Sequence, residues 1–343
     1  MKASLQTKEL FLGVDIGGTR TRIGLVALEN GRLRLLESKE ILTKTVTASS
    51  FATALVDAAN AAKKKYGVRP SKAAIACAGP ISVKGGRHRV ELTNAPLTLD
   101  EETLLSKTRF ERVLLLNDFE ALAWSVDALE PKKLKVIRRG VPAPGSRLLI
   151  GPGTGLGISI LVQDPTGVWR PVASEGAHTP FPLETVEDFG LAAFITETER
   201  RNSFISYEDI LSGKGVERIY NHLRLTKCKR PEFPPTLTAA EIFKTRTTNR
   251  CSAMTIELFL DVLGRAARNM TLQACAWNGV TLGGGVVIKN KEVVGKRFVD
   301  AFSRYPNPRF ARLLEKVPLQ LLTDEHAAIV GGAAALVHAR ERE

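Results

Sequence analysis

Apolar and polar residues alternate along the first part of the chain. The alternation runs through residues 10–17, 21–28 and 33–42 and predicts three successive strands. Residues 52–65 then follow a helical pattern, and residues 73–78 form an apolar run typical of a buried strand. A further strand at 113–116 precedes a helix over 119–129, in which apolar residues recur at i, i+3 and i+7.

The same order begins again after a segment rich in Pro, Lys and Gly, which covers residues 130–145 and reads as a connection. The elements predicted there are strands at 147–151, 156–163 and 168–173, helices to about 248, a long helix over 253–276, a strand at 280–282 and a strand and helix between 319 and 340. We expect an α/β protein with two ribonuclease H-like domains facing a cleft. Residues 1–129 plus 322–343 would form a small domain and residues 130–321 a large one, with the hinge and cleft between them.

A glycine-rich loop joins two of the later strands, where residues 150–157 read Ile-Gly-Pro-Gly-Thr-Gly-Leu-Gly. A dinucleotide fingerprint or a P-loop would continue as a helix, whereas this segment continues as alternating strand residues. Backbone N–H groups of a glycine-rich hairpin can approach an anion closely, and a threonine hydroxyl adds a donor. The loop therefore predicts a phosphate-binding hairpin, with Gly153, Thr154 and Gly155 at its tip.

A second hairpin of this design lies near the start of the chain, in the sequence Asp15-Ile-Gly17-Gly18-Thr19-Arg20. Asp15 could hold a hydrated Mg²⁺ facing the phosphates, and Thr19 and Arg20 could donate to them. Either hairpin alone could be an ordinary tight turn, but two in one chain favour a duplicated nucleotide-binding architecture.

Asn117 and Asp118 stand where a buried strand meets a helix. The helix N-terminus favours the anionic form of Asp118, which we expect to be ionised at pH 7 and able to accept a proton from a substrate hydroxyl. An isolated aspartate here is usually only a helix cap. The amide of Asn117 suits a sugar hydroxyl as well as it suits a turn.

Several other polar positions are weaker candidates. Glu175 and His178 lie three residues apart in a loop, and both can hydrogen-bond to sugar hydroxyls. Glu208 and Asn94 are undistinguished by themselves. A third glycine cluster follows the strand at 280–282 and would let a flat nucleoside approach the backbone, although a sharp turn explains it equally well: Gly283, Gly284 and Gly285.

Composition limits the alternatives. The 343 residues carry a net charge of +13, but the basic residues are dispersed, so we expect anionic small-molecule substrates and no nucleic-acid partner. The four cysteines are far apart, and we expect Cys77 and Cys275 to be reduced core residues. The N-terminal residues have no apolar signal core and no apolar run is long enough to span a bilayer, so a cytoplasmic protein without membrane contact is expected.

Taken in order, these motifs resemble bacterial glucokinases of the hexokinase and actin-like ATPase superfamily, over nearly the whole chain. The resemblance implies transfer of the ATP γ-phosphoryl group to the 6-hydroxyl of glucose, with Asp118 as the general base. It places Mg²⁺ mainly on the ATP phosphates. The implied sugar contacts are Asn94, Asn117, Asp118, Glu175, His178 and Glu208. The implied ATP contacts are Gly17, Gly18, Thr19, Gly153, Thr154, Gly155, Gly283, Gly284 and Gly285.

Other functions on the same fold stay open at this point. A kinase for another hexose, or one that uses polyphosphate, would keep the same base. A sugar sensor without turnover would not need Asp118 or intact phosphate loops. A transcriptional regulator is disfavoured, because the chain lacks the cysteine-rich zinc motif of the related repressors and kinases and an N-terminal helix-turn-helix. Small residues at 331–335 pack closely, either within the chain or across a homodimer.

Overall fold

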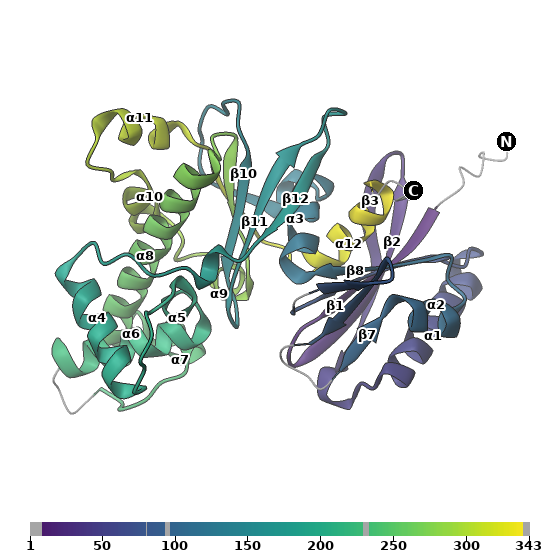
Figure 1. Cartoon of the computed structure of the whole chain (residues 1–343), viewed down its shortest axis with the longest axis horizontal. Helices are drawn as coiled ribbons and strands as arrows, with labels where there is room; N and C mark the ends of the chain where they lie inside the picture. Colours follow the sequence, from purple (N-terminus) through teal and green to yellow (C-terminus); the bar gives the residue numbers. More distant parts are fainter. Residues whose placement is uncertain (1–8, 80, 93–96, 229–232, 339–343) are drawn as a thin grey trace. The chain divides into compact units, whose positions relative to one another are not determined.

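The computed structural model describes residues 9–79, 81–92, 97–228 and 233–338 (Figure 1). The chain divides into two compact units. The first unit comprises Met1–Lys133, Gln163–Ala173 and Asp324–Glu343, and the second comprises Leu134–Val162 and Ser174–Thr323. The change of unit at Lys133 and Leu134 lies four residues after the expected boundary. The sequence did not predict that residues 163–173 group with the first unit.

The first unit is built on a sheet of strand order β3-β2-β1-β4-β8. Its strands are β1 (Glu9–Ile16), β2 (Arg20–Glu29), β3 (Arg32–Leu42), β4 (Lys72–Cys77) and β8 (Arg112–Asn117). β1 pairs with β2 and β2 with β3 in antiparallel fashion, whereas β1, β4 and β8 run parallel. The predicted strands of this unit are confirmed.

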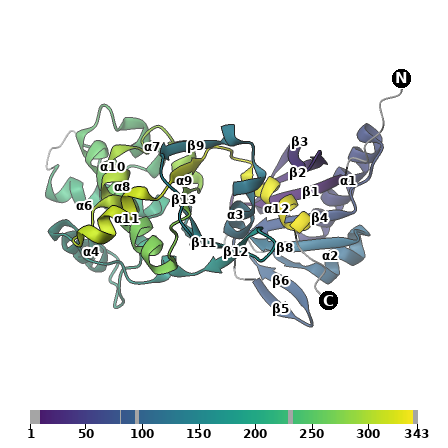
Figure 2. The same cartoon turned by 90° about the horizontal axis from the view of Figure 1, so that it is seen from above.

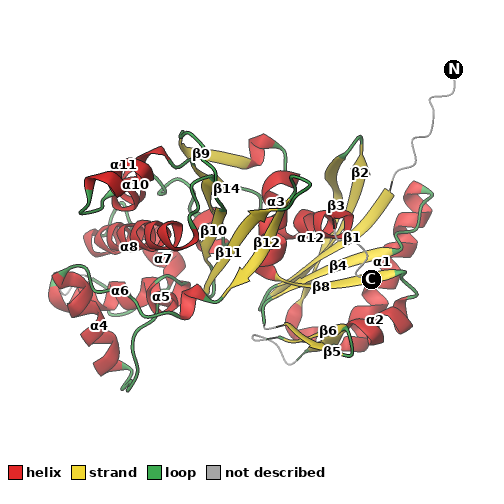
Figure 3. Cartoon of the chain, turned by 45° about the horizontal axis from the view of Figure 1, so that its top comes forward, coloured by secondary structure: helices red, strands yellow, loops and turns green. Residues whose placement is uncertain are grey.

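Helices cover both faces of this sheet (Figure 3). Leu10, Leu12 and Val14 pack into a cluster with α1 and α2, while Phe11 between them joins a separate cluster with α3 and α12. This is the alternation that period two requires. The helices are α1 (Ala48–Tyr66), α2 (Glu101–Thr108), α3 (Asp118–Ala128) and α12 (Ala327–His338).

The small residues of α12 are used inside the first unit. An added Cβ at Gly331 would lie 1.8 Å from the carbonyl oxygen of Ala121 on α3, and one at Gly332 would lie 3.1 Å from the Ala74 Cβ on β4. These glycines therefore let α12 approach α3 and the sheet closely. The sequence left open whether these small residues pack within the chain or across a homodimer, and Gly331 and Gly332 pack within the chain.

A small sheet that the sequence did not predict also belongs to the first unit, with strand order β5-β6-β7. Its members are β5 (Ile81–Lys84), β6 (Arg87–Glu91) and β7 (Thr98–Asp100). β5 and β6 are joined by Gly85 and Gly86, both at positive φ. A Gly-Gly pair between two extended segments is a hairpin signal, so this sheet could have been predicted.

In the second unit the strands follow the order β11-β10-β13-β14-β9. They are β9 (Leu134–Arg138), β10 (Arg147–Pro152), β11 (Leu156–Gln163), β13 (Gly279–Leu282) and β14 (Leu319–Leu322). β12 (Trp169–Ser174) follows β11 along the chain, and its residues up to Ala173 group with the first unit. The antiparallel β11-β10 pair and the parallel β10, β13 and β14 repeat the arrangement of β2, β1, β4 and β8. The expected architectural repeat is therefore present. The segment 130–145 is not only a connection, because β9 pairs with β14.

Helices make up most of the rest of the second unit, and α10 packs along the long buried α8 (Figure 2). They are α4 (Val186–Thr198), α5 (Tyr207–Ile210), α6 (Gly213–Thr226), α7 (Ala239–Thr245), α8 (Arg250–Ala274), α9 (Gly285–Lys289), α10 (Lys296–Ser303) and α11 (Pro308–Lys316). Within the described ranges, the helices are too short or too polar to cross a bilayer.

The cysteines are free thiols, and Cys77 is buried as expected. The prediction for Cys275 is wrong, because this residue is exposed. It terminates α8 in the left-handed conformation, with φ of 49°, and so leaves the core at the helix end.

Candidate functional site

An acidic edge forms in the first unit where three parallel strands end. Asp15 on β1 lies opposite Ala76 on β4, and Cys77 next to it lies opposite Asn117 on β8. Asp118 follows directly as the first residue of α3. Carboxyl ends of parallel strands meet at one edge of a sheet, which is where α/β folds bind ligands. The structure therefore brings Asp15, Asn117 and Asp118 together from three strands.

Asn117 and Asp118 have different local roles. Asn117 caps α3, with its Oδ1 accepting a hydrogen bond from the Phe119 N–H at 2.9 Å. Asp118 is therefore not the cap, although its Oδ1 also accepts from Phe119 at 3.0 Å. Burial raises the pKa of Asp118, and the backbone N–H groups at the helix start lower it by less. The helix N-terminus acts in the expected direction, but burial outweighs it.

Asp15 shares this environment. Its pKa is raised to about 6, mainly by burial and then by the negative charge of Asp118, while Arg22 lowers it. Arg22 faces Asp15 across the β1-β2 pair, with its Nη1 3.8 Å from Oδ2 of Asp15. A buried carboxylate pair of this kind favours a proton or a cation between its members.

Arg22 is a site residue that the sequence analysis missed. Its Nε donates to Oε2 of Glu40 at 3.1 Å, and its Nη1 donates to the carbonyl of Glu325 at 3.3 Å. Its place opposite Asp15 could have been predicted, because the position of the turn sets which residues face each other in a hairpin. The positive charge of Arg22 thus offsets part of the negative charge at the acidic edge.

The turn between β1 and β2 exposes its tip. Gly18, Thr19 and Arg20 are exposed, and the turn is closed by a hydrogen bond from the Gly17 N–H to the carbonyl of Arg20. The hydroxyl of Thr43 donates to the carbonyl of Gly17 at 2.7 Å and fixes the turn from outside. Arg20 forms an ion pair with Glu40, so its guanidinium already has an anionic partner in this structure.

The second unit contains the larger glycine cradle. β10 and β11 pair as far as Pro152 and Leu156, so the predicted hairpin is confirmed. The Gly153 N–H donates to the carbonyl of Gly155 at 2.7 Å, and the carbonyl of Gly153 accepts from the Gly213 N–H at 2.9 Å. Thr154, at the tip, is exposed. The hydrogen bond from Gly213, the first residue of α6, therefore fixes the backbone of the loop.

The third glycine cluster lies directly against this hairpin. An added Cβ at Gly151 would lie 2.3 Å from the carbonyl of Gly283, and one at Gly284 would lie 2.5 Å from the carbonyl of Pro152. Gly284 also has a φ of 79°, which favours glycine, and it is the N-cap residue of α9, which begins at Gly285. The two glycine clusters thus form one continuous surface of backbone, on which a nucleotide could lie.

Glu208 is bound to the same loop. Its Oε2 accepts a hydrogen bond from the Leu156 N–H at 2.9 Å, and an added Cβ at Gly155 would lie 2.3 Å from that oxygen. Glu208 therefore connects the glycine hairpin to α5. From the sequence, we expected this residue only to contact the sugar.

Glu175 directly precedes the short turn Gly176–His178, and His178 is its last residue. Their side chains are 82% and 59% exposed, and the Nε2 of His178 lies 3.5 Å from Oε2 of Glu175. Both can therefore turn toward a ligand. Asn94 lies outside the described residues. In the portion of the chain that the structure describes, no group of three or more His, Cys, Asp or Glu side chains is arranged as a metal site.

Comparison with known proteins decides between the families that could carry such a site. A family model described as glucokinase matches residues 12–339. The chain belongs to the glucokinase family. A curated glucokinase from Mesorhizobium japonicum is 31% identical over 323 residues, which cover 93% of this chain and 89% of the relative.

Solved glucokinase structures share the fold. The structure of a glucokinase from an Antarctic psychrotroph has a TM-score of 0.79 at 25% sequence identity, and the match covers 96% of this chain and 99% of that chain. The glucokinase from Balamuthia mandrillaris in complex with glucose has a TM-score of 0.76 at 24% identity, covering 97% of this chain and 95% of its own. The two ribonuclease H-like units are thus those of the actin-like ATPase fold, and this glucokinase family member is a phosphotransferase.

Proposed function

We propose that this glucokinase family member transfers the γ-phosphoryl group of ATP to the 6-hydroxyl of glucose and releases glucose 6-phosphate and ADP. The observation that carries the proposal is the half-buried Asp118 at the carboxyl edge of three parallel strands, beside Asp15. Together with the glycine cradle of the second unit, it supplies a base for one substrate and a phosphate site for the other.

Asp118 acts as the general base in this proposal. Its carboxylate accepts the proton of the 6-hydroxyl while the hydroxyl oxygen bonds to the γ-phosphorus and the bond to the ADP oxygen breaks. Burial raises the pKa of Asp118 toward the working pH, which makes the carboxylate a better proton acceptor. Hydrogen bonds from the Phe119 N–H fix the carboxylate and the neighbouring amide of Asn117, which would hold a second sugar hydroxyl.

The remaining sugar contacts are assigned to side chains in loops and at helix starts. Glu175 and His178 are exposed and adjacent, so both can turn to hydroxyl groups. Glu208 has one oxygen on the Leu156 N–H and would offer the other to the sugar. Asn94 is assigned by resemblance to the family alone.

The phosphates of ATP would lie on backbone N–H groups. The proposed contacts in the first unit are those of Gly17, Gly18 and Thr19, with Arg20 able to exchange Glu40 for a phosphate oxygen. In the second unit, Gly153, Thr154 and Gly155 would face the phosphates. The nucleoside would lie against Gly283, Gly284 and Gly285, and at Gly284 a side chain would collide with the carbonyl of Pro152 in the hairpin.

Asp15 fits a role toward Mg²⁺. The ion itself would be held mainly by the ATP phosphates. Burial and then the charge of Asp118 raise the pKa of Asp15, so a cation beside this carboxylate would favour its ionised form. Asp15 would hold the hydration shell of the ion, which when bound neutralises charge on the phosphates. We further propose that the protein works in the cytoplasm, where ATP and Mg²⁺ are available. Any homodimer would use a surface other than the buried glycines of α12.

The test is Mg²⁺- and ATP-dependent formation of glucose 6-phosphate by the parent protein and by an Asp118→Asn variant. We expect turnover in the parent and a loss of kcat of about 100- to 10,000-fold in the variant, as for removal of a positioned base. Asp57→Asn, at an exposed position of α1, is the matched control and should retain full activity.

A panel of hexoses, with polyphosphate as a second phosphoryl donor, completes the experiment. Turnover of another hexose, or of polyphosphate, in preference to glucose and ATP would replace the proposed substrate. Binding of glucose without turnover of any sugar would favour a sensor. Equal activity in Asp118→Asn would remove Asp118 from the role of base.

A further inference from the structure

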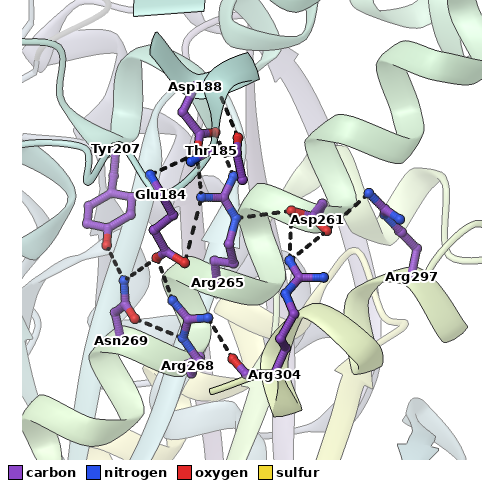
Figure 4. Close-up of polar contacts among 10 residues, drawn as sticks. All are labelled: Glu184, Thr185, Asp188, Tyr207, Asp261, Arg265, Arg268, Asn269, Arg297 and Arg304. Atoms are coloured by element: carbon purple, nitrogen blue, oxygen red, sulfur yellow. Dashed lines mark hydrogen bonds and ion pairs between the residues drawn. The ribbon is translucent and has the colours of Figure 1, made fainter. Parts of the chain in front are cut away.

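A cluster of charged and polar side chains runs along one face of α8 in the second unit (Figure 4). Asp261, Arg265, Arg268 and Asn269 are spaced by four, three and one residues, so they project from neighbouring positions of the helix. None of these residues belongs to the proposed contacts with glucose or ATP. The cluster ends at Tyr207, the residue directly before Glu208.

The buried part of the cluster is fully paired. Arg265 donates two hydrogen bonds to the carboxylate of Asp188, at 2.7 and 2.9 Å, and its Nε donates to Asp261 at 3.0 Å. Asp188 also accepts from the backbone N–H groups of Glu184 and Thr185 and so fixes the start of α4. Paired in this way, the buried charges form a rigid support, because moving any member would leave another buried and unpaired.

This support determines how the amide of Asn269 is oriented. The Nε of Arg268 donates to Oδ1 of Asn269 at 3.0 Å, and the guanidinium is held in turn by Glu184 and by the carbonyl of Arg304. The amide nitrogen of Asn269 must therefore point the other way. There it donates to the hydroxyl of Tyr207 at 3.0 Å.

Tyr207 in turn holds two segments that carry proposed sugar contacts. Its backbone N–H donates to the carbonyl of Thr179, next to His178, and the Phe181 N–H donates to the carbonyl of Ile205. The rings of Tyr207 and Phe181 pack edge to face with centroids 6.0 Å apart, and the guanidinium of Arg265 lies over the Phe181 ring. The loop of His178 and the segment before Glu208 are thus fastened to each other and to α8.

Glu208 continues this line of contacts to the glycine hairpin, since its carboxylate accepts from the Leu156 N–H. A rotation of α5 that moved Tyr207 would move Glu208 as well, because they are consecutive residues of one helical turn. The position of the Glu208 carboxylate is therefore set at one end by the hairpin and at the other by Tyr207.

We propose that Tyr207 and Asn269 are positioning residues, which hold Glu208 and the His178 loop in the geometry that binds the hexose. The proposal rests on the proposed function, because it assigns sugar contacts to Glu208 and His178. Neither positioning residue touches the sugar. They act through the hydrogen bond between the Asn269 amide and the Tyr207 hydroxyl.

Tyr207→Phe tests this proposal, because it removes the hydroxyl and keeps the buried ring. We expect the KM for glucose, and its dissociation constant measured by calorimetry, to rise about three- to tenfold, the effect of one lost hydrogen bond. The kcat should stay within about twofold, because Asp118 lies in the other unit. Asn269→Ala should give a similar rise, and the double variant should be no worse than either single one.

Tyr220→Phe is the matched control. Tyr220 is another buried tyrosine of the second unit, and its hydroxyl donates to the carbonyl of Pro234 at 3.1 Å, away from the site residues. An unchanged KM for glucose in Tyr207→Phe would overturn the proposal, even with a lowered melting temperature, and so would an equal rise in Tyr220→Phe. Absence of glucose turnover in the parent protein would instead contradict the proposed function, while calorimetry with glucose would still test the positioning role.

Discussion

Two carboxylates at one sheet edge dominate the chemistry at the scale of single residues. Asp15 and Asp118 lie close enough for the charge of Asp118 to raise the pKa of Asp15, and Arg22 offsets only part of this effect. Burial, and then the charges of Asp118 and Asp15, raise the pKa of the neighbouring Cys77 thiol to about 12, so this thiol stays protonated and unreactive. Residues that prepare the site for a cationic ligand therefore destabilise the protein without it.

Replacing Asp15 by Asn should stabilise the protein in a pH-dependent way. An aspartate has a pKa near 3.9 in an unfolded chain and Asp15 has one of about 6 when folded, so the folded protein binds more protons between these values. The stabilising contribution of protonated Asp15 is therefore lost as the pH rises from about 4 to about 6. We expect Asp15→Asn to be more stable than the parent by about 2–3 kcal/mol at pH 7 and about equal to it at pH 4.

Urea unfolding of both proteins from about pH 4 to about pH 8, which is about two pH units on either side of the pKa of Asp15, would measure this difference. The same variant should lose activity with Mg²⁺ and ATP, since the stabilising change removes a site carboxylate. Stability curves that run parallel across the pH range would show that the pKa of Asp15 is not raised. Asp57→Asn serves again as the exposed control.

At the scale of elements, strands with many buried residues were predicted well, and the strands that were missed have few buried residues. β1 and β4 have nearly continuous buried residues, and the glycine hairpin at residues 150–157 formed as expected. β9 was missed because it is an edge strand with no fully buried residue, so its sequence carries no alternation. β5, with four residues, and β6, with Val90 as its one buried residue, were missed because they are short and mostly not buried, although Gly85 and Gly86 marked their turn.

The residues of the candidate site likewise include some that the sequence predicted and some that it did not. The glycine hairpins and the place of Asp118 at a strand end were predictable from residue type and pattern, whereas their chemical roles stay predictions. The roles of Arg22, Tyr207 and Asn269 depend on contacts between residues far apart in the sequence, and no local pattern records such contacts. The second function of Glu208, as a partner of the Leu156 N–H, was hidden in the same way.

The packing of α12 gives a prediction for a single methyl group. In Gly331→Ala the added Cβ would lie 1.8 Å from the carbonyl oxygen of Ala121, a backbone atom that cannot rotate away. We expect a loss of about 2–4 kcal/mol in the free energy of unfolding of the first unit, as for an overpacked core. Urea denaturation followed by circular dichroism would measure it.

Gly295→Ala is the control for this substitution. A Cβ at Gly295 meets nothing within 4 Å, and its φ of −164° lies outside the left-handed region that favours glycine. Its free energy of unfolding should stay within about 0.5 kcal/mol of the parent value, as for most surface changes. A Gly331→Ala variant as stable as this control would contradict the close approach of α12 to α3.

At the scale of the whole molecule, the chain passes between the two units at Lys133–Leu134, Val162–Gln163, Ala173–Ser174 and Thr323–Asp324. The net charge of +13 is distributed over both units, and many of the basic residues are engaged. Lys133 pairs with Asp324 and Lys227 with Glu187, while Arg138 donates to the carbonyls of Leu314 and Val317. Much of the positive charge therefore serves structure within each unit.

We predict that glucose protects the connections between the units from proteolysis. Sugar kinases limit hydrolysis of ATP by closing on their substrates, which removes freedom from the segments that join their domains. Trypsin has targets at Lys132 and Lys133, directly at the first connection. Cleavage there should slow several-fold with saturating glucose, measured by mass spectrometry of the fragments.

Galactose, which differs from glucose at one hydroxyl group, is a control for nonspecific protection by sugar. Cleavage at Lys65, in α1 and remote in sequence from the connections, should keep its rate with either sugar. An unchanged rate at Lys132 and Lys133 with glucose bound would argue against closure as the response to sugar.

The position of α12 also governs how the protein is made. This helix completes the core of the first unit by covering Phe11, Val26 and Ala74, which belong to strands translated long before it. While the ribosome synthesises the intervening residues, α3 has been made but α12 has not, so part of that apolar face of the nascent sheet stays uncovered. The first unit to emerge is thus the last to finish folding, and chaperones that bind apolar segments have a target until residue 338 has left the exit tunnel.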